Sequence, residues 1–367
     1  MRVKLGDIFE IGSGGTPSKS HPEYYGGDIP WVKTGDLKNE YLYEVEDFIT
    51  EEGLKNSAAK VYEADTVLIA MYGATIGATS ILKINACTNQ ACAAFKKNEQ
   101  VIPEYLYYFL RSKKKKFVKD GVGGAQPNIS AGYLKKVEME LPSIEDQRVI
   151  VDILETISDI VIKRKQEIQS LDNLIKARFV EMFGNPVTNE KGWKQKLLGE
   201  ITTKIGSGAT PKGGKSAYQE DGITLIRSMN VHNGIFEYKE LAHISDEQAT
   251  KLDNVAIEEN DVLLNITGAS VARSCVVPSE ILPARVNQHV CIIRCKECII
   301  PEFLNKLLID DNYQELLWGI AGAGATREAI TKQQVESLQI IMPPVELQNE
   351  FMRFCNQVDK SKFVAQK

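Results

Sequence analysis

Apolar side chains recur along residues 144–183 at alternating steps of four and three residues. This stretch has no glycine or proline and is followed by Gly184-Asn185-Pro186, so it predicts one continuous helix of about 40 residues and about 60 Å. Ser143 and Asp146 can cap its first turn. The alternation is that of a coiled-coil seam, formed here by Ile150, Leu154, Ile157, Val161, Ile168, Leu171 and Ile175.

A single helix with such a seam would leave it exposed to water, so we expect a partner helix. Residues 343–367 supply a shorter one, whose seam positions are Phe351, Cys355 and Val358. The two helices are expected to form an intramolecular antiparallel pair. Because the second helix is much shorter than the first, either this chain is a shortened variant or the distal part of the first helix pairs with another molecule.

Outside these helices the chain repeats itself, which is the main signal of its architecture. Leu5-Gly6-Asp7-Ile8 returns as Leu198-Gly199-Glu200-Ile201 at an offset of 193 residues. The segment 141–147 returns as 342–348 at an offset of 201. The drift between the offsets indicates small loop insertions within one fold that is used twice.

Within each copy, β-branched runs bounded by Gly, Asn and Pro predict strands, while 104–116 and 302–318 predict helices. The predicted fold class is α+β, with two repeated mixed α/β domains separated by long coiled-coil helices in a pseudo-two-fold arrangement. The expected boundaries are 1–142 for the first domain, 143–183 for the spacer helix, 184–342 for the second domain and 343–367 for the short C-terminal helix.

Composition agrees with a globular protein, since 43% of the 367 residues are hydrophobic and 25% are charged. The formal net charge of -5 gives no general affinity for polyanions. Apolar runs such as 66–71 are far shorter than the roughly 20 residues of a membrane-spanning helix, and the N-terminus does not read as a signal peptide. Seven scattered cysteines suit reduced thiols. We therefore expect a cytoplasmic protein without membrane contact.

Three patterns resemble parts of enzymes. Residues 209–216 fit a loosened phosphate-binding loop, but a proline lies inside it and the first copy lacks the Lys-Ser end. Cys291, Cys295 and Cys298 have iron–sulfur spacing, yet the first copy has no cysteine at these places. Asn185-Pro186-Val187 lacks the second proline and the aromatic residue of an amino-methyltransferase motif.

The four histidines show no zinc-site spacing, and no acid–base pair or activated nucleophile is evident. The sequence therefore predicts a binding protein with no catalytic residue, metal or cofactor of its own. The alternatives are a coiled-coil scaffold that binds only protein and, less favoured, a stand-alone DNA methyltransferase or nuclease.

Two copies of one fold on a stiff helix can read two short DNA sites at a fixed separation. Side chains shared by both copies are expected to serve the scaffold or the phosphates, and divergent ones the base edges. The shared polar candidates are Ser13, Thr16, Lys33, Thr34, Thr75, Asn89 and Gln90, with Ser207, Thr210, Arg227, Ser228, Ser270, Asn287 and Gln288 as their counterparts.

Other candidate DNA contacts differ between the copies or lie in basic segments. They are Tyr72, Gln126, Asn128, Arg273, Thr326 and Arg327, together with Lys19, Lys113, Lys114, Lys212, Lys215 and Asn230. The lysine runs at 113–116 and 135–136 could contact phosphates, or the first could simply balance the dipole of a helix end.

Four segments carry a specific resemblance: Gly14–Ser18, Gly27–Val32, Leu141–Gln147 and Arg178–Gly184, most of them with echoes in the second half. With them, essentially the whole chain resembles the DNA-specificity subunit of Type I restriction-modification systems. The resemblance implies that the two domains are target-recognition domains and that the chain reads a bipartite, asymmetric site in double-stranded DNA.

The resemblance also implies partners. It implies two methyltransferase subunits that bind S-adenosylmethionine and methylate adenine, and restriction subunits that use ATP and Mg²⁺, so these cofactors would belong to the partner subunits. The helices 143–183 and 343–364 would separate the half-sites and dock the methyltransferase subunits. Base contacts cannot be carried over from the family, because target-recognition domains vary too much.

Overall fold

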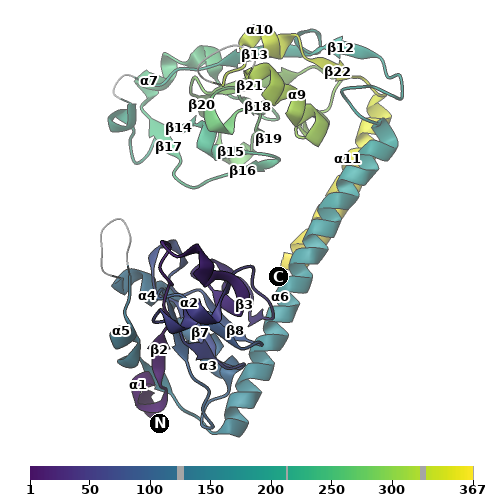
Figure 1. The fold of residues 1–367 in the computed structure, drawn as a ribbon. Coiled ribbons are helices and arrows are strands. Elements are labelled where there is room, and N and C mark those ends of the chain that lie inside the picture. Colours follow the sequence, from purple (N-terminus) through teal and green to yellow (C-terminus); the bar gives the residue numbers. More distant parts are fainter. Residues whose placement is uncertain (122–127, 212–213, 323–327, 367) are drawn as a thin grey trace. The chain divides into compact units, whose positions relative to one another are not determined.

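The chain forms two compact units, residues 1–162 and 163–367, in a computed structural model that describes residues 1–121, 128–211, 214–322 and 328–366. The long helix α6 (Ile144–Phe183) begins in the first unit and ends in the second (Figure 1). The mixed α and β fold class and the long helix predicted between two domains are confirmed. The domain boundaries at residues 142 and 342 stay predictions.

The described residues of unit 1 form three sheets and five short α-helices before α6. Its strands are β1 (Arg2–Lys4), β2 (Ile11–Ser13), β3 (Tyr25–Val32), β4 (Tyr41–Leu42), β5 (Phe48–Ile49), β6 (Val61–Tyr62), β7 (Val67–Ala70), β8 (Thr79–Leu82), β9 (Ala86–Thr88), β10 (Cys92–Phe95) and β11 (Glu138–Glu140). Its helices are α1 (Leu5–Ile8), α2 (Glu51–Lys55), α3 (Pro103–Ser112), α4 (Lys114–Asp120) and α5 (Ala131–Lys135).

The central sheet of unit 1 has the strand order β2-β10-β7-β8-β4 and is covered on both faces. Along β7, Val67 and Ile69 pack in one core with residues of α3, α4 and α5, whereas Leu68 and Ala70 pack in a second core with β3, β6 and β9. Successive side chains of a strand point to opposite faces, so an uninterrupted apolar run requires cover on both sides. The result is a layer of helices, a central sheet and a smaller sheet of order β5-β3-β9-β6.

Unit 2 repeats most of these elements in the same order, with β15 and β16 at the place of β4 and no strand at the place of β6 among the described residues. Its strands are β12 (Gln195–Leu197), β13 (Thr202–Ser207), β14 (Ile223–Ile226), β15 (Val231–His232), β16 (Ile235–Phe236), β17 (Ala242–Ile244), β18 (Val262–Asn265), β19 (Ser274–Val276), β20 (Ala284–Val286), β21 (Val290–Cys295) and β22 (Gln339–Ile341). Its helices are α7 (Asp246–Thr250), α8 (Pro301–Leu308), α9 (Asp311–Gly322), α10 (Lys332–Glu336) and α11 (Val345–Gln366).

The central sheet of unit 2, of order β13-β21-β18-β19, is layered like its counterpart in unit 1. On β18, Val262 and Leu264 pack with α8, α9 and α10, whereas Leu263 packs with the smaller sheet β17-β14-β20. The first of these cores also takes in the end of α6 and all of the α11 seam.

The two helices of the predicted coiled coil pair antiparallel within unit 2. The rings of Phe179 and Phe351 lie 5.5 Å apart edge to face, and the Lys362 ammonium pairs with Asp172 at 2.6 Å. Ile175 belongs to the same core. The predicted partner positions on α11 are buried, namely Phe351, Cys355 and Val358.

The first half of the predicted seam behaves differently. Ile150, Ile157 and Val161 are 37%, 51% and 46% exposed, because in unit 1 the helix turns another face to the protein, the one that carries the buried residues Gln147 and Val151. This half of the predicted seam therefore has its apolar side chains in solvent, and its pairing with another molecule stays a prediction. None of the described helices is both long enough and apolar enough to cross a lipid bilayer.

Candidate nucleic-acid interface

Several loops that are distant in sequence meet at one edge of unit 1. We call residues 14–18, 33–36, 71–76, 88–91 and 128 the unit 1 loop edge; they lie after β2, β3 and β7, between β9 and β10, and before α5. Two backbone hydrogen bonds join them, since Asn89 N–H donates to Val32 O at 2.9 Å and Met71 N–H donates to Ala91 O at 2.8 Å. A bridge between Tyr72 and Asn128 adds the last segment.

The same construction recurs in unit 2. We call residues 208–211, 227–230, 266–271, 287–289 and 328–329 the unit 2 loop edge. Asn287 N–H donates to Ile226 O at 3.1 Å, and Ile266 N–H donates to His289 O at 3.0 Å. A bridge between Thr267 and Ala329 completes it. Each unit therefore gathers the predicted polar residues of several loops on one surface.

A glycine in each repeated Gly-Ser-Gly stretch makes this arrangement possible. A Cβ on Gly14 would lie 1.8 Å from the carbonyl oxygen of Thr88, and one on Gly208 would lie 1.8 Å from that of Val286. No side chain fits at such distances, so the loop after β2 can lie against the end of β9, and the loop after β13 against the end of β20, only with glycine at this position. The repeated glycines are a requirement of the loop edge itself.

One pair of side chains is identical in the two loop edges. The Thr16 hydroxyl donates to Oε1 of Gln90, and the Thr210 hydroxyl donates to Oε1 of Gln288. Both glutamines are exposed. The sequence predicted each of these four residues as a DNA contact, and the structure brings them together in pairs.

The shared basic residue of each edge is held by its own unit. The Lys33 ammonium forms an ion pair with Asp47, which raises the pKa of the lysine. In unit 2, Arg227 donates to the backbone carbonyl of Glu240 and lies over the ring of Tyr218 at 5.4 Å. These contacts fix where a positive charge lies on each surface.

The remaining predicted residues fall into three groups. Asn230 and Asn287 are buried, and their side chains bond backbone groups in or next to the edge, so here they position neighbouring loops. Others are at least partly exposed at or beside the edges: Ser13, Lys19, Thr34, Tyr72, Thr75, Asn89, Asn128, Ser207, Ser228, Ser270 and Arg273. Gln126, Lys212, Thr326, Arg327 and the side chain of Lys215 lie outside the described residues.

The two edges differ in the residues that surround the shared Thr-Gln pair. Unit 1 has Tyr72 and Ala91 where unit 2 has Thr267 and His289. His289 is a functional candidate that the sequence did not single out, because no motif or histidine spacing marks it. The one sequence feature that could have identified it is its position directly after the repeated pair Asn287-Gln288.

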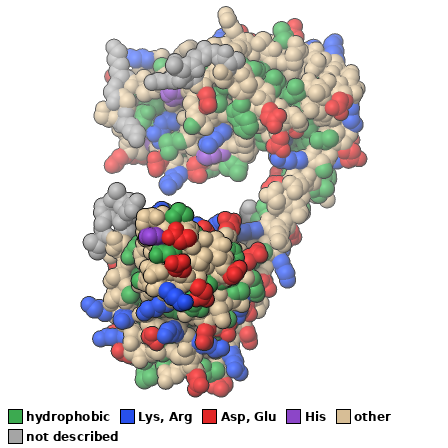
Figure 2. Space-filling model, viewed as in Figure 1, with side chains coloured by type: hydrophobic (Ala, Val, Ile, Leu, Met, Phe, Trp, Pro, Cys, Tyr) green, Lys and Arg blue, Asp and Glu red, His purple; other side chains and the backbone are tan. Residues whose placement is uncertain are grey.

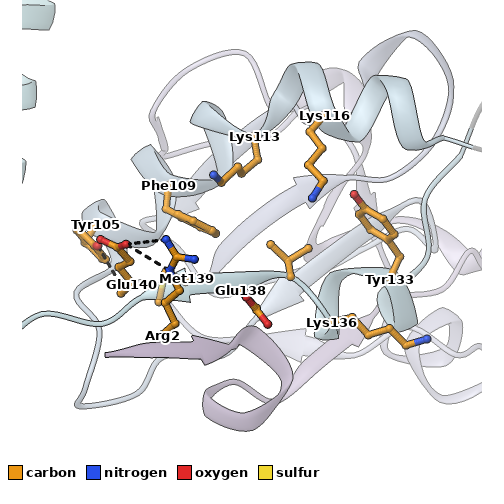
Figure 3. Close-up of a pocket in the computed structure, with 11 residues that line it drawn as sticks. Arg2, Tyr105, Phe109, Lys113, Lys116, Tyr133, Lys136, Glu138, Met139 and Glu140 are labelled. Carbon is orange, nitrogen blue, oxygen red and sulfur yellow. Dashed lines mark hydrogen bonds and ion pairs between the residues drawn. The ribbon is translucent and has the colours of Figure 1, made fainter.

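The two predicted lysine runs of unit 1 meet in a separate pocket. Lys113 and Lys116, at the end of α3 and on α4, and Lys136, which follows α5, line one cavity of about 660 Å³ (Figure 3). Its walls include the rings of Phe109 and Tyr133. Lys114 lies elsewhere, against Gly77 beside the unit 1 loop edge. On the face shown in Figure 2, acidic and basic side chains are interspersed in each unit.

The three cysteines whose spacing resembles that of an iron–sulfur site lie at and after one strand of unit 2. Cys291 is buried on β21, and burial raises the pKa of its thiol to about 12, as it does for Cys295. No group of three or more metal-binding side chains occurs in the described parts of the chain.

The family of Type I restriction modification DNA specificity domains matches this chain twice, over residues 1–173 and 190–366. The two matches cover the two copies of the repeat. The chain therefore belongs to this family and is a DNA specificity subunit of the Type I restriction-modification class.

Individual relatives agree. The chain is 28% identical over 371 residues to the Type I restriction enzyme MjaIX specificity subunit of Methanocaldococcus jannaschii, covering 95% of this chain and 84% of the relative. It is 29% identical over 157 residues to the EcoR124I/EcoR124II specificity subunit of Escherichia coli, covering 41% and 39% of the two chains.

Solved structures have the same fold. The S subunit from M. genitalium superposes with a TM-score of 0.57 at 13% identity, covering all of this chain and 91% of that one. A chain from a study of complex assembly and conformational transition of the Type I R-M system superposes with a TM-score of 0.63 at 17% identity, covering 99% and 91%.

Proposed function

We propose that the two loop edges read the two halves of a split, asymmetric DNA site, and that the chain contributes no catalytic group of its own. The observation that carries this proposal is the repetition of one polar edge with different neighbours. The Thr-Gln pair is common to both edges, whereas the Tyr72 and Ala91 positions of unit 1 are occupied by Thr267 and His289 in unit 2. Different base-facing groups on the same scaffold select different half-sites.

The segment of α6 in unit 1 supports docking of another protein. Its exposed apolar stripe, which we call the α6 stripe, comprises Val149, Ile150, Ile153, Ile157 and Ile160, each at least 37% exposed. Spacings of three and four residues put these side chains on one helical face. Contiguous apolar surface of this kind marks protein interfaces, and we assign it to a methyltransferase subunit.

In this proposal the chemistry lies in the partners. Two methyltransferase subunits would bring S-adenosylmethionine, and restriction subunits would bring ATP and Mg²⁺. The lysines of the unit 1 pocket, Lys113, Lys116 and Lys136, would add phosphate contacts outside the loop edge. Because the net charge is -5, binding by the isolated chain should be weak and should fall steeply with salt.

The test is selection from random duplex DNA, with the purified chain alone and with its cognate methyltransferase subunit. We expect recovery of a motif with two defined blocks separated by an undefined gap. The double variant Tyr72→Thr, Ala91→His, which copies unit 2, should change the bases recognised in one block only. Recovery of no split motif in either condition would refute the proposal.

A further inference from the structure

A chain of side-chain hydrogen bonds crosses the unit 2 loop edge and has no equivalent in the described residues of unit 1. Beyond the bond from Thr210 to Gln288, the Nε2 atom of Gln288 lies 3.0 Å from Nε2 of His289. On the other side of the ring, Nδ1 of His289 lies 2.5 Å from the hydroxyl oxygen of Thr267. Four residues from three loops are thus linked in sequence.

The bond from Thr210 places the amide oxygen of Gln288 on the Thr210 side, so the amide nitrogen faces His289. Because that nitrogen donates, Nε2 of His289 accepts in this arrangement, and the neutral ring carries its proton on Nδ1. That proton is donated to Thr267. Both ring nitrogens are therefore occupied, and His289 has no polar atom left with which to contact DNA.

Gln288, by contrast, keeps free hydrogen-bonding capacity. It is exposed, and after its bonds to Thr210 and His289 its carboxamide retains one N–H and one lone pair of Oε1. A donor and an acceptor side by side match the N7 and N6 groups of adenine in the major groove, the base that glutamine reads with two bonds. The bonds to Thr210 and His289 hold the carboxamide at both ends, so its free donor and acceptor lie at fixed positions on the surface.

Unit 1 lacks this restraint. Among the described residues, the side chain of Gln90 bonds to Thr16 alone, and Ala91 and Tyr72 occupy the positions of His289 and Thr267. No second described side chain fixes the position of its Nε2 atom. Side chains therefore hold both ends of the carboxamide of Gln288 in unit 2, and one end of the carboxamide of Gln90 in unit 1.

We propose that His289 is a positioning residue that holds the Gln288 carboxamide in the orientation that reads adenine in the half-site of unit 2. This inference rests on the proposed DNA-reading function and specifies how one edge achieves its selectivity. A side chain fixed before binding loses less conformational freedom on binding, so it discriminates better.

The experiment compares His289→Ala, which copies unit 1, with wild type in the complex with the methyltransferase subunit, using random-duplex selection. The adenine preference at one position of one block should fall about two- to tenfold, with the other block unchanged. Gln288→Ala should abolish the preference at the same position, and adding His289→Ala to it should change nothing more. His289→Asn, whose carboxamide oxygen can also accept from Gln288, should retain part of the preference.

Two results would overturn the inference. One is an unchanged adenine preference in His289→Ala although Gln288→Ala loses it; the other is a uniform loss of affinity at every position, which indicates damage to the fold. A thermal melt of each variant identifies that damage independently. Absence of a split motif in wild type would instead defeat the proposed function, so the two failures are distinct.

Discussion

The Gln147 side chain accepts a hydrogen bond from the backbone N–H of Ile102 at 3.0 Å, which ties the first turn of α6 to the start of α3. The same side chain donates to the carbonyls of Gln100 and Pro142 at 2.8 and 3.1 Å, and it is fully buried. Unit 2 repeats the device, since Gln348 accepts from Ile300 N–H at 2.9 Å. A buried glutamine thus anchors each long helix to its own unit.

Replacing this glutamine should destabilise one unit selectively. Gln147→Ala strands a buried N–H and two carbonyls, so we expect unit 1 to lose about 2 to 4 kcal/mol of unfolding free energy. Calorimetry or urea unfolding measures the loss of unfolding free energy. Gln348→Ala should destabilise unit 2 by a similar amount. The exposed neighbour Arg148→Gln is the control. Equal stability of Gln147→Ala and the control would contradict the anchoring role.

The pairing of α6 with α11 should depend on one aromatic residue. Phe351 is fully buried and its ring lies 5.5, 5.4 and 6.4 Å from the rings of three other phenylalanines, Phe179, Phe183 and Phe303. Phe351→Ala should therefore cost unit 2 about 3 to 5 kcal/mol in urea unfolding. Val364→Ala, on the same helix but 68% exposed, should cost less than about 0.5 kcal/mol. Similar costs for both variants would show that the cluster does not hold the helices together.

The length of α6 should set the gap between the half-sites. Four helical residues inserted after Ile162, at the boundary between the units, add about 6 Å to the helix. Selected duplexes should then show a longer gap and the same letters in both blocks. A four-residue insertion also rotates one part of the helix surface against the other. A seven-residue insertion keeps the apolar faces of the helix aligned and is the control for this rotation. New letters with an unchanged gap would exclude α6 as the spacer.

The α6 stripe should be needed for the partner and not for the fold. Ile153 is 54% exposed, so Ile153→Glu should reduce capture of the methyltransferase subunit at least tenfold while the melting temperature changes little. Gln166→Glu adds the same charge on another face of the helix and should bind normally. Normal capture by Ile153→Glu would rule the stripe out as the docking site.

Most of the cysteines should resist modification in the native protein. Burial raises the pKa of the thiols of Cys92, Cys275, Cys291 and Cys295 to about 12, and of Cys87 and Cys355 to about 11. Only the thiolate reacts, and at pH 8 on the order of one in a thousand or fewer of these groups is ionised. Ellman's reagent at pH 8 should label fewer than half of the seven cysteines until guanidinium is added. Rapid labelling of all seven would indicate open cores.

Sequence by itself determined the duplicated fold, the long helix and the buried partner positions on α11. These follow from local and periodic signals: β-branched runs bounded by Gly, Asn and Pro predict strands, and the residues from 144 to 183 carry helical periodicity without a breaker. Neighbours along the chain supply enough information for such features, because strand and helix periods are properties of the backbone.

Only the tertiary structure decided which side chains meet. Thr16 and Gln90 are 74 residues apart, and Thr267 and His289 are 22 apart on different loops, so no periodicity links them. The α6 stripe was decided in the same way, since unit 1 binds the face of Gln147 and Val151 and leaves Ile153 in solvent. Contacts between distant segments depend on how layers of structure pack, and a pattern along the chain records which residues are apolar without recording what covers them.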